Sequence, residues 1–351
     1  MKQRLSNFIC LVFLAAILVT AVVYNMSKPR VMVLHSYDPA YAWTRDVDKG
    51  LRRVMDQWSG CTVTWHYMST KKLSDPQWLE RAGILARRAI KETNPRVLIA
   101  VDDLAQSRAA RHFVDHPTMD IVFAGVNGGV DSYGYTGAAN VTGIFERKQL
   151  TAVKEAILAL ESKKAVPNPT PSVTYVVDPS PSLARGLPHI RAFDWAPVKF
   201  KAAVIAKDYP DWKETIMAHG SRSDYLLVAN YRKLHMDGPD SPYADPAQVM
   251  AWTDRASAAP VIGINSFNVE DGAMISIGVS PFEQGEEAAR MAETILKKNV
   301  RAGTLPMKKN RQYVVAIRED SLRQKHMALP AIYEAFGRAT ENFIEAESPQ
   351  E

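Results

Sequence analysis

Polar residues recur where short apolar runs of this sequence stop. The run at 31–34 is followed by His35, Ser36 and Tyr37, and the run at 97–101 is followed by Asp102 and Asp103. Continuous apolar runs of this length are typical of strands that are covered on both faces in a parallel sheet. Ligands bind such sheets at the carboxyl ends of the strands, where loops and helix N-termini present free N–H groups. The candidate contacts at six run ends are Ser36, Tyr37, Asp102, Asp103, Asn127, Asp178, Asn230, Asn265 and Phe267.

The chemistry of these side chains suits a small ligand with both charges. Asp102 and Asp103 can bind an ammonium group, while Ser36, Asn127 and backbone amides can hold a carboxylate. An amino acid offers both groups. The competing interpretation is that each polar residue only caps the helix after its strand. For any single residue both interpretations stay open.

Aromatic residues crowd the first of these loops, where Tyr37, Tyr41 and Trp43 follow one another closely. They either stack on a ligand, which adds Trp43 to the candidate contacts, or pack the loop against its own lobe.

Motifs of catalysis and metal binding are weak. The sequence contains no G-x-S-x-G, no H-E-x-x-H and no Walker loop, and the glycines at 125–129 do not match the dinucleotide fingerprint. His35, Ser36 and Asp38 are too close in sequence to be interpreted as a triad. His112 and His116 have helical spacing, which we interpret as a surface pair rather than a zinc site. We therefore predict no catalytic residue, no metal ligand and no cofactor.

Strand-like and helical patterns alternate from residue 30 onwards, which predicts α/β structure with parallel, doubly wound sheets. Prolines at 167, 169 and 171 interrupt this rhythm, and it then restarts. About 320 residues after the first segment exceed a single typical core and favour two lobes. The expected strands lie at 31–34, 63–67, 97–101, 121–124 and 140–144, then at 173–177, 202–206, 225–229, 261–264, 273–279 and 313–317.

The first segment has the pattern of an export signal. Lys2 and Arg4 precede an apolar run from residue 8 to residue 24, at the short edge of the roughly 17–25 residues that span a bilayer. A cleaved signal peptide and a retained membrane anchor both fit. Outside this segment Cys61 is alone, so no intramolecular disulfide is expected. The net charge of +5 is too small and too scattered to indicate nucleic-acid binding, so no nucleic-acid partner is expected.

Several motifs in order along the chain resemble the ABC-transporter substrate-binding family that includes tryptophan- and tyrosine-binding members. They are Asn-Val-Thr-Gly at 140–143, Asp-Gly-Ala-Met-Ile-Ser-Ile-Gly at 271–278, Gly-Glu-Glu-Ala-Ala at 285–289 and Ala-Leu-Pro at 328–330. His35, Ser36 and Tyr37 with Trp43 also resemble ligand-sensing extracytoplasmic domains of related fold. The resemblance covers nearly the whole chain after the first segment.

The resemblance implies a type I periplasmic binding fold, in which the chain crosses three times between two lobes. Lobe one would comprise 28–145 and 270–306, and lobe two 146–269 and 307–345, with 1–27 as signal peptide or anchor and 346–351 as a tail. The crossings would lie near Phe145, 267–270 and Pro306. The family usually has two glycines where this chain has Asp271 and Gly272, so Asp271 joins the candidate ligand contacts.

The expected function is that of an exported, periplasmic or extracytoplasmic binding protein, with attachment to the inner membrane left open. It would capture a small polar ligand, an amino acid or a derivative, between its lobes and deliver it to an ABC-type permease. One alternative is a membrane-anchored sensory subunit that signals to a membrane partner through the same fold. A third interpretation, from another class, is a hydrolase on this scaffold.

Overall fold

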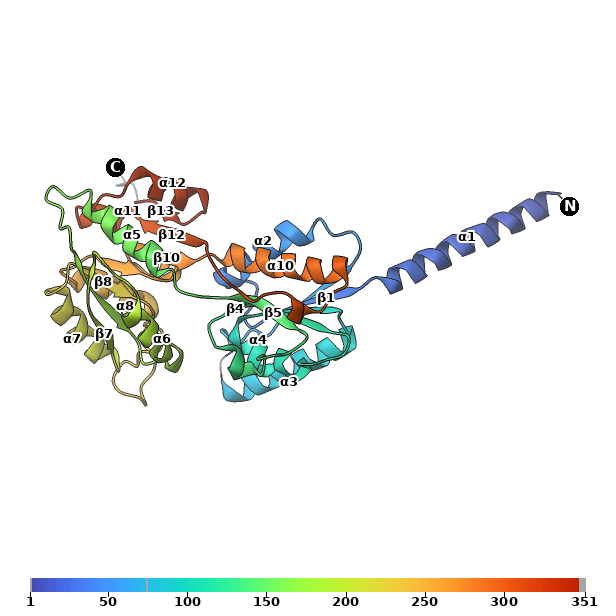
Figure 1. Ribbon diagram of the computed structural model, residues 1–351, viewed down its shortest axis with the longest axis horizontal. Coiled ribbons are helices and arrows are strands. Elements are labelled where there is room, and N and C mark those ends of the chain that lie inside the picture. Colours follow the sequence, from blue (N-terminus) through green and yellow to red (C-terminus); the bar gives the residue numbers. More distant parts are fainter. Residues whose placement is uncertain (1, 74, 347–351) are drawn as a thin grey trace. The chain divides into compact units, whose positions relative to one another are not determined.

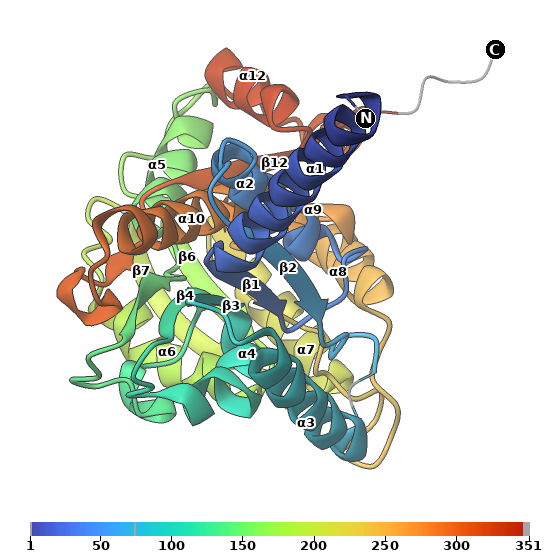
Figure 2. The same cartoon turned by 90° about the vertical axis from the view of Figure 1, so that its right-hand side faces the viewer.

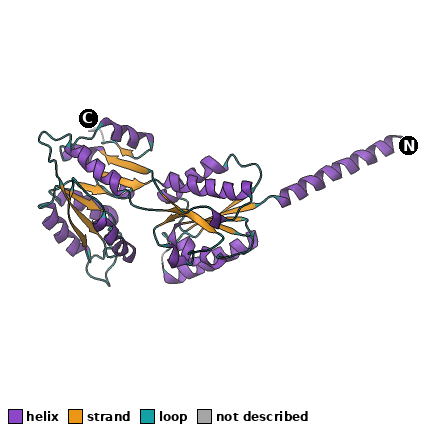
Figure 3. Cartoon of the chain, viewed as in Figure 1, coloured by secondary structure: helices purple, strands orange, loops and turns teal. Residues whose placement is uncertain are grey.

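The computed structural model describes residues 2–73 and 75–346, except for the side chains of residues 2–6, 8, 26 and 181–185. The chain forms two compact units, of which unit 1 comprises 1–146 and 281–309 and unit 2 comprises 147–280 and 310–351. The tail expected at 346–351 lies outside the described residues after residue 346. In each unit strands alternate with helices along the chain, and the strands form one sheet (Figure 3).

Unit 1 is built on a parallel six-stranded sheet with the strand order β11-β5-β4-β3-β1-β2. Its strands are β1 (Arg30–His35), β2 (Thr62–Tyr67), β3 (Val97–Val101), β4 (Asp120–Val126), β5 (Val141–Phe145) and β11 (Lys308–Lys309). Its helices are α2 (Ala42–Met55), α3 (Pro76–Thr93), α4 (Asp102–Arg108) and α10 (Pro281–Lys298), with the 3-10 helices η1 (Ala110–Phe113), η2 (Val130–Tyr133) and η3 (Ala302–Thr304).

Both faces of this sheet are covered, as the continuous apolar runs predict. Met32 and Leu34 of β1 pack in a cluster with α3 and α4, whereas Val31 and Val33 pack on the opposite face with α2 and α10. Figures 1 and 2 show α2 and α10 together on one side of the sheet and α3 and α4 on the other. A strand that is buried on both faces can present polar groups to a ligand only at its ends. The candidate ligand contacts therefore lie along the edge of the sheet where the strands have their carboxyl ends.

Unit 2 has a seven-stranded sheet with the order β13-β12-β10-β9-β8-β6-β7. Its strands are β6 (Ser172–Val177), β7 (Lys199–Ile205), β8 (Tyr225–Val228), β9 (Val261–Gly263), β10 (Ile275–Val279), β12 (Tyr313–Arg318) and β13 (Phe343–Ile344). Its helices are α5 (Leu150–Glu161), α6 (Pro181–Ala192), α7 (Tyr209–Gly220), α8 (Pro246–Ala256), α9 (Phe267–Glu270), α11 (Glu319–Gln324) and α12 (Ala331–Ala339). One apolar cluster involves α5, and the other involves α7 and α8.

The return of the chain explains two departures from the expected layout. β10 pairs with β9 and β12 in unit 2, so the chain passes to unit 1 at residue 281, whereas the expected lobe one began at residue 270. After α10 the chain re-enters unit 2 beside the carboxyl end of β10, where Ser280 N–H donates to the Gln312 carbonyl. β12 therefore runs antiparallel to β10, with Val279 opposite Tyr313, in an otherwise parallel sheet.

The first segment forms the helix α1 (Lys2–Ser27), whose apolar side chains from Ile9 to Tyr24 are exposed wherever the structure describes them. Within the described part of the chain, no helix is both long enough and apolar enough to cross a membrane.

Two glycines allow α2 and α10 to pack against each other at close range. A Cβ on Gly285 of α10 would lie 2.2 Å from the carbonyl oxygen of Val47 in α2. A Cβ on Gly50 of α2 would lie 2.2 Å from the carbonyl oxygen of Phe282 in α10. Real side chains do not approach backbone so closely. Any residue other than glycine at these two positions would therefore force the helices to shift. The Gly-Glu-Glu-Ala-Ala motif thus supplies a helix-packing residue.

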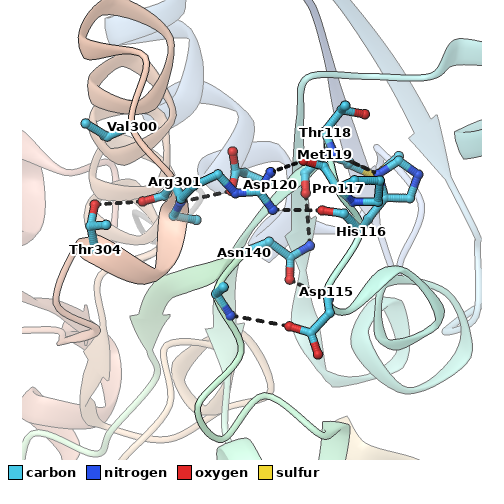
Figure 4. A network of polar contacts seen from close by, with 12 residues as sticks. Asp115, His116, Pro117, Thr118, Met119, Asp120, Asn140, Val300, Arg301 and Thr304 are labelled. Atoms are coloured by element: carbon cyan, nitrogen blue, oxygen red, sulfur yellow. Dashed lines mark hydrogen bonds and ion pairs between the residues drawn. The ribbon is translucent and has the colours of Figure 1, made fainter.

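A buried carboxylate fastens the return of α10 at the opposite, amino end of the unit 1 strands (Figure 4). Asp120 is fully buried; its Oδ2 accepts a hydrogen bond from Arg96, and its Oδ1 accepts one from Ala302 N–H at 2.9 Å. Arg301 Nε lies 3.2 Å from the same Oδ1, and its two Nη atoms donate to the carbonyls of Pro117 and His116. One carboxylate therefore links β3, β4 and the segment after α10.

We expect Gly285→Ala to destabilise the protein although alanine favours helices by about 1 kcal/mol over glycine. The new methyl group collides with α2 backbone, and overpacking of this kind costs about 1–3 kcal/mol. The free energy of unfolding in urea measures the effect. Gly60→Ala is the control, because a Cβ at Gly60 has no neighbour within 4 Å; equal effects of both substitutions would contradict the packing role.

We expect Asp120→Ala to lower the free energy of unfolding by about 3–5 kcal/mol. The substitution removes the carboxylate from a buried ion pair and leaves Arg96 and Arg301 without their negative partner. Urea denaturation of the full chain gives the measurement. The matched control is Glu92→Ala, which removes an exposed i,i+4 ion pair with Arg88. This substitution should lower the free energy of unfolding by about 0.5 kcal/mol or less. A loss at Asp120 no larger than that at Glu92 would refute this prediction.

Candidate functional site

The carboxyl ends of β1, β3 and β4 bring several predicted residues of unit 1 together. Ser36 is buried, and its hydroxyl donates to the Val101 carbonyl at 2.8 Å and accepts from Ala105 N–H at 2.7 Å. It ties β1 to β3 and accepts from an N–H group of α4, so it does not cap the helix that follows its own strand. Its hydrogen-bonding capacity is largely used within unit 1.

Asp103 organises the loop after β4. Its Oδ1 accepts hydrogen bonds from Gly128 N–H at 3.0 Å and from the Tyr133 hydroxyl, and its Oδ2 accepts one from Asn127 N–H at 3.3 Å. The side-chain amide of Asn127 donates to Glu146 Oε2 at 3.0 Å. Asp103 and Asn127 are thus close together, and both shape this edge of the sheet.

Asp102 differs from these neighbours because half of its carboxylate has no hydrogen-bond partner. It is only 4% exposed, and its Oδ1 accepts from the Trp43 indole N–H at 2.9 Å. Its Oδ2 is buried and lacks a hydrogen-bond partner among the described residues. Such a group costs about 1–3 kcal/mol in the free protein. Gly125, at φ +64°, is required beside it, since a Cβ there would lie 2.9 Å from Asp102 Oδ1.

The surroundings of Asp102 favour its neutral form. Burial raises its pKa well above the usual range, and the negative charges of Glu146 and Asp103 raise it further. The hydrogen bond from Trp43 and the positive charge of Lys71 lower the pKa of Asp102, but these effects are smaller than those that raise it. An added cation at this edge would relieve the repulsion among the three carboxyl groups.

The predicted aromatic residues lie at the same edge. The rings of Tyr37 and Tyr41 meet edge to face with centroids 5.4 Å apart, and Lys71 Nζ lies 5.0 Å and 5.3 Å from the two centroids. Burial, followed by the charge of Asp102, raises the pKa of Tyr37 well above its usual value. Its phenol therefore stays neutral beside the carboxylates. These contacts show that the aromatic loop is packed locally and lies next to Asp102, and the stacking of its rings on a ligand stays a prediction.

In unit 2, two predicted residues are engaged in the fold. Asp178 is buried, and its two oxygens accept hydrogen bonds from the backbone N–H groups of Ser180 and Lys233, each at 3.0 Å. Asn230 Oδ1 accepts from Arg232 N–H at 3.3 Å. Both side chains bond to the loops after β6 and β8, and both carboxylate oxygens of Asp178 are engaged by backbone N–H groups.

The other predicted residues of unit 2 form a cluster with an arginine. Asp271 Oδ2 accepts from the Tyr231 hydroxyl at 2.6 Å and from Arg232 Nη2 at 2.7 Å. The Arg232 guanidinium lies 4.3 Å from the centroid of Phe267. Burial and then Asp271 raise the pKa of Tyr231, so its phenol remains a hydrogen-bond donor. Asp271 therefore orients two neighbours.

Asn265, the remaining predicted residue of unit 2, contacts the first residues of that unit. Its Oδ1 accepts a hydrogen bond from Lys148, and its Nδ2 donates to the Ala229 carbonyl. We did not predict Glu146, Lys148 or Arg232 as site residues. Arg232 stands two residues beyond the predicted Asn230, and Glu146 and Lys148 follow directly after the crossing expected near Phe145. Their closeness in sequence to these predicted features could have identified them as candidates.

The residues considered for catalysis and metal binding are engaged elsewhere. The buried His35 stacks on Tyr67, and its Nε2 lies 2.7 Å from Asp48 Oδ1. His116 Nδ1 accepts hydrogen bonds from the backbone N–H groups of Thr118 and Met119 (Figure 4). No group of three or more His, Cys, Asp or Glu side chains in the described residues is arranged to hold a metal ion.

Comparisons with known proteins agree with this architecture. Residues 238–332 match the family model described as ABC transporter substrate binding protein. A comparison with curated protein sequences found no match.

Solved structures resemble the chain over most of its length. A conserved domain protein from Vibrio cholerae is 17% identical with a TM-score of 0.58, covering 88% of this chain and 98% of its own. CD0873 from Clostridium difficile, described as a substrate binding protein with adhesive properties, is 13% identical with a TM-score of 0.65, covering 91% and 99%. An ABC domain in complex with L-Trp from Streptococcus pneumonia is 12% identical with a TM-score of 0.59, covering 88% and 98%. These findings confirm the resemblance: the chain has the type I periplasmic binding fold, and its residues 238–332 carry the pattern of ABC transporter substrate-binding proteins.

Proposed function

We propose that this protein binds a small polar ligand, an amino acid or a derivative, outside the cytoplasm and delivers it to an ABC-type permease. The observation that carries the proposal is the buried Asp102 with a carboxylate oxygen that has no partner among the described residues. Polar groups of this kind are normally satisfied, and exceptions call for an explanation. A ligand ammonium group that takes this oxygen is the explanation we favour.

The neighbours of Asp102 support a cationic group on the ligand. Asp103 and Glu146 add negative charge around it, and Tyr37 and Trp43 supply aromatic surface next to it. Aromatic rings and carboxylates together favour an ammonium over a neutral sugar hydroxyl. An L-Trp-bound structure among those of similar fold is in keeping with such a ligand.

Other parts of the proposal rest on sequence. Residues 1–27 would direct export, as a cleaved signal or a retained anchor, and the mature protein would act without catalysis. A sensory role stays the alternative. The fold is also similar to that of one chain in the structure of the TorS sensor domain with TorT (9% identity, TM-score 0.50). Cross-linking in the native membrane distinguishes the two roles, since a permease and a sensor kinase are different partners.

A thermal-shift screen of the full chain against the twenty L-amino acids and a set of sugars tests the proposed ligand class. At least one amino acid should raise the melting temperature, because a ligand at 100 times its Kd adds about 2.7 kcal/mol of stability. Asp102→Asn should weaken that binding by about 5- to 150-fold, the equivalent of about 1–3 kcal/mol. The control is Asp56→Asn at the exposed end of α2. Binding of sugars alone, or of nothing in the set, would sink the proposal.

We also expect Asp102→Asn to stabilise the ligand-free protein at neutral and basic pH. The pKa of Asp102 is raised in the folded state, so the folded protein holds this proton more tightly than the unfolded chain, whose pKa is about 3.9. Wild-type stability therefore falls as pH rises from about 4 through the folded pKa, and the Asn variant lacks this loss. Urea unfolding at pH 4 and pH 8 should show the gain of the variant at pH 8 shrinking toward pH 4. A difference independent of pH would contradict the role of Asp102 ionisation.

A further inference from the structure

The guanidinium of Arg232 is held in one position by contacts on two sides. Nη2 donates to Asp271 Oδ2 at 2.7 Å, and Cζ lies over the Phe267 ring at 4.3 Å from its centroid. The side chain as a whole is 30% exposed. Stacking and the charge-assisted hydrogen bond fix a planar group that still reaches solvent.

A purely structural clip does not account for this arrangement. The Tyr231 hydroxyl already joins the loop after β8 to the end of α9 through the same Asp271 oxygen, at 2.6 Å. Arg232 adds a second bond to that oxygen but leaves its own Nε buried without a hydrogen-bond partner among the described residues. A contact that served only to stabilise the fold would not be expected to leave a buried donor without a partner, because such a donor destabilises the fold.

The chemistry of the cluster fits an anion. Lys148 donates to the neutral amide oxygen of Asn265, whose own amide donates to the carbonyl of Ala229, three residues before Arg232. Two cations and the Asp271 carboxylate thus lie at the carboxyl edge of this sheet, whereas the Asp178 carboxylate is fully buried and bound by backbone N–H groups. A guanidinium offers a planar fork that matches a carboxylate.

We propose that Arg232, fixed by Asp271 and Phe267, forms an anion-binding subsite of unit 2 that takes the carboxylate group of the ligand. This inference rests on the proposed function and names the residue that would read the acidic end of an amino acid. It also replaces Ser36 and Asn127 in that role, since the first is bonded within its own unit and the second donates to Glu146. Asp271 acts as a positioning residue and Lys148 as a second cation.

The experiment follows the arginine Nε–H signals of the isotopically labelled full chain by NMR while benzoate is added at constant ionic strength. Arg232→Lys, or Arg232→Gln if the first variant does not fold, assigns the signal. We expect the Arg232 signal to shift saturably with benzoate and not with benzyl alcohol, the uncharged analogue. A titration with sulfate separates planar from tetrahedral anions.

Arg318 is the internal control, because its Nε is also buried without a partner while its Nη2 donates to the carbonyls of Val269 and Glu270. Its signal should stay in place. No saturable shift at Arg232, equal shifts at Arg318, or a response to sulfate but not to benzoate would each overturn the inference. The melting temperature of Arg232→Lys should change by about 2 °C or less, and a much larger loss would show that Arg232 is a structural clip.

This test is independent of the ligand screen. If no amino acid binds but benzoate shifts Arg232, the proposed function fails and the anion subsite stands. If an amino acid binds while benzoate leaves Arg232 unchanged, the ligand class stands and the assignment of its carboxylate to Arg232 fails.

Discussion

Burial of both faces of a parallel sheet is the constraint on which the rest of this structure depends. Once helices cover β1, β3 and β4 on both sides, the strands can offer polar chemistry only where they end. All parallel strands end at one edge, so residues far apart in sequence, such as Trp43 and Asp102, come within hydrogen-bonding distance. The same rule in unit 2 joins Tyr231 to Asp271. The two edges differ in their charged groups: Asp102, Asp103 and Glu146 lie near Lys71 in unit 1, whereas Arg232 and Lys148 lie with Asp271 in unit 2.

Much of the fold could be predicted because its signals are local. An apolar run such as 97–101 identifies a strand wherever it lies, and the structure has β3 at Val97–Val101. The direction of β12 and the crossing at residue 281 could not be predicted in this way. They depend on which strands pair after a helix is inserted elsewhere, and pairing partners leave no periodic pattern in the sequence.

The candidate site shows a similar division. Strand ends located Ser36, Asp102 and Asp178 at the correct edges, but not what each side chain does there. Ser36 and Asp178 are satisfied by backbone groups, whereas Asp102 retains an unpaired oxygen, and only three-dimensional neighbours distinguish these cases. Arg232 was missed because a charged residue in a loop normally indicates a solvated surface. Its contact with Phe267, 35 positions later in the sequence, is a tertiary feature.

The late position of α10 has a consequence for the order in which the units form. Ala288, Ala292 and Ile295 complete the apolar cluster around Val31 and Val33 of β1, although some 250 residues separate them in the sequence. During synthesis from the N-terminus, α2 is available early to cover part of this face of the unit 1 sheet, but the part that α10 covers has no partner until the residues from 281 onwards are made. Unit 2 must likewise wait for β12, which follows α10. Both units therefore take their last contacts from the C-terminal part of the sequence, and such long-range contacts slow folding.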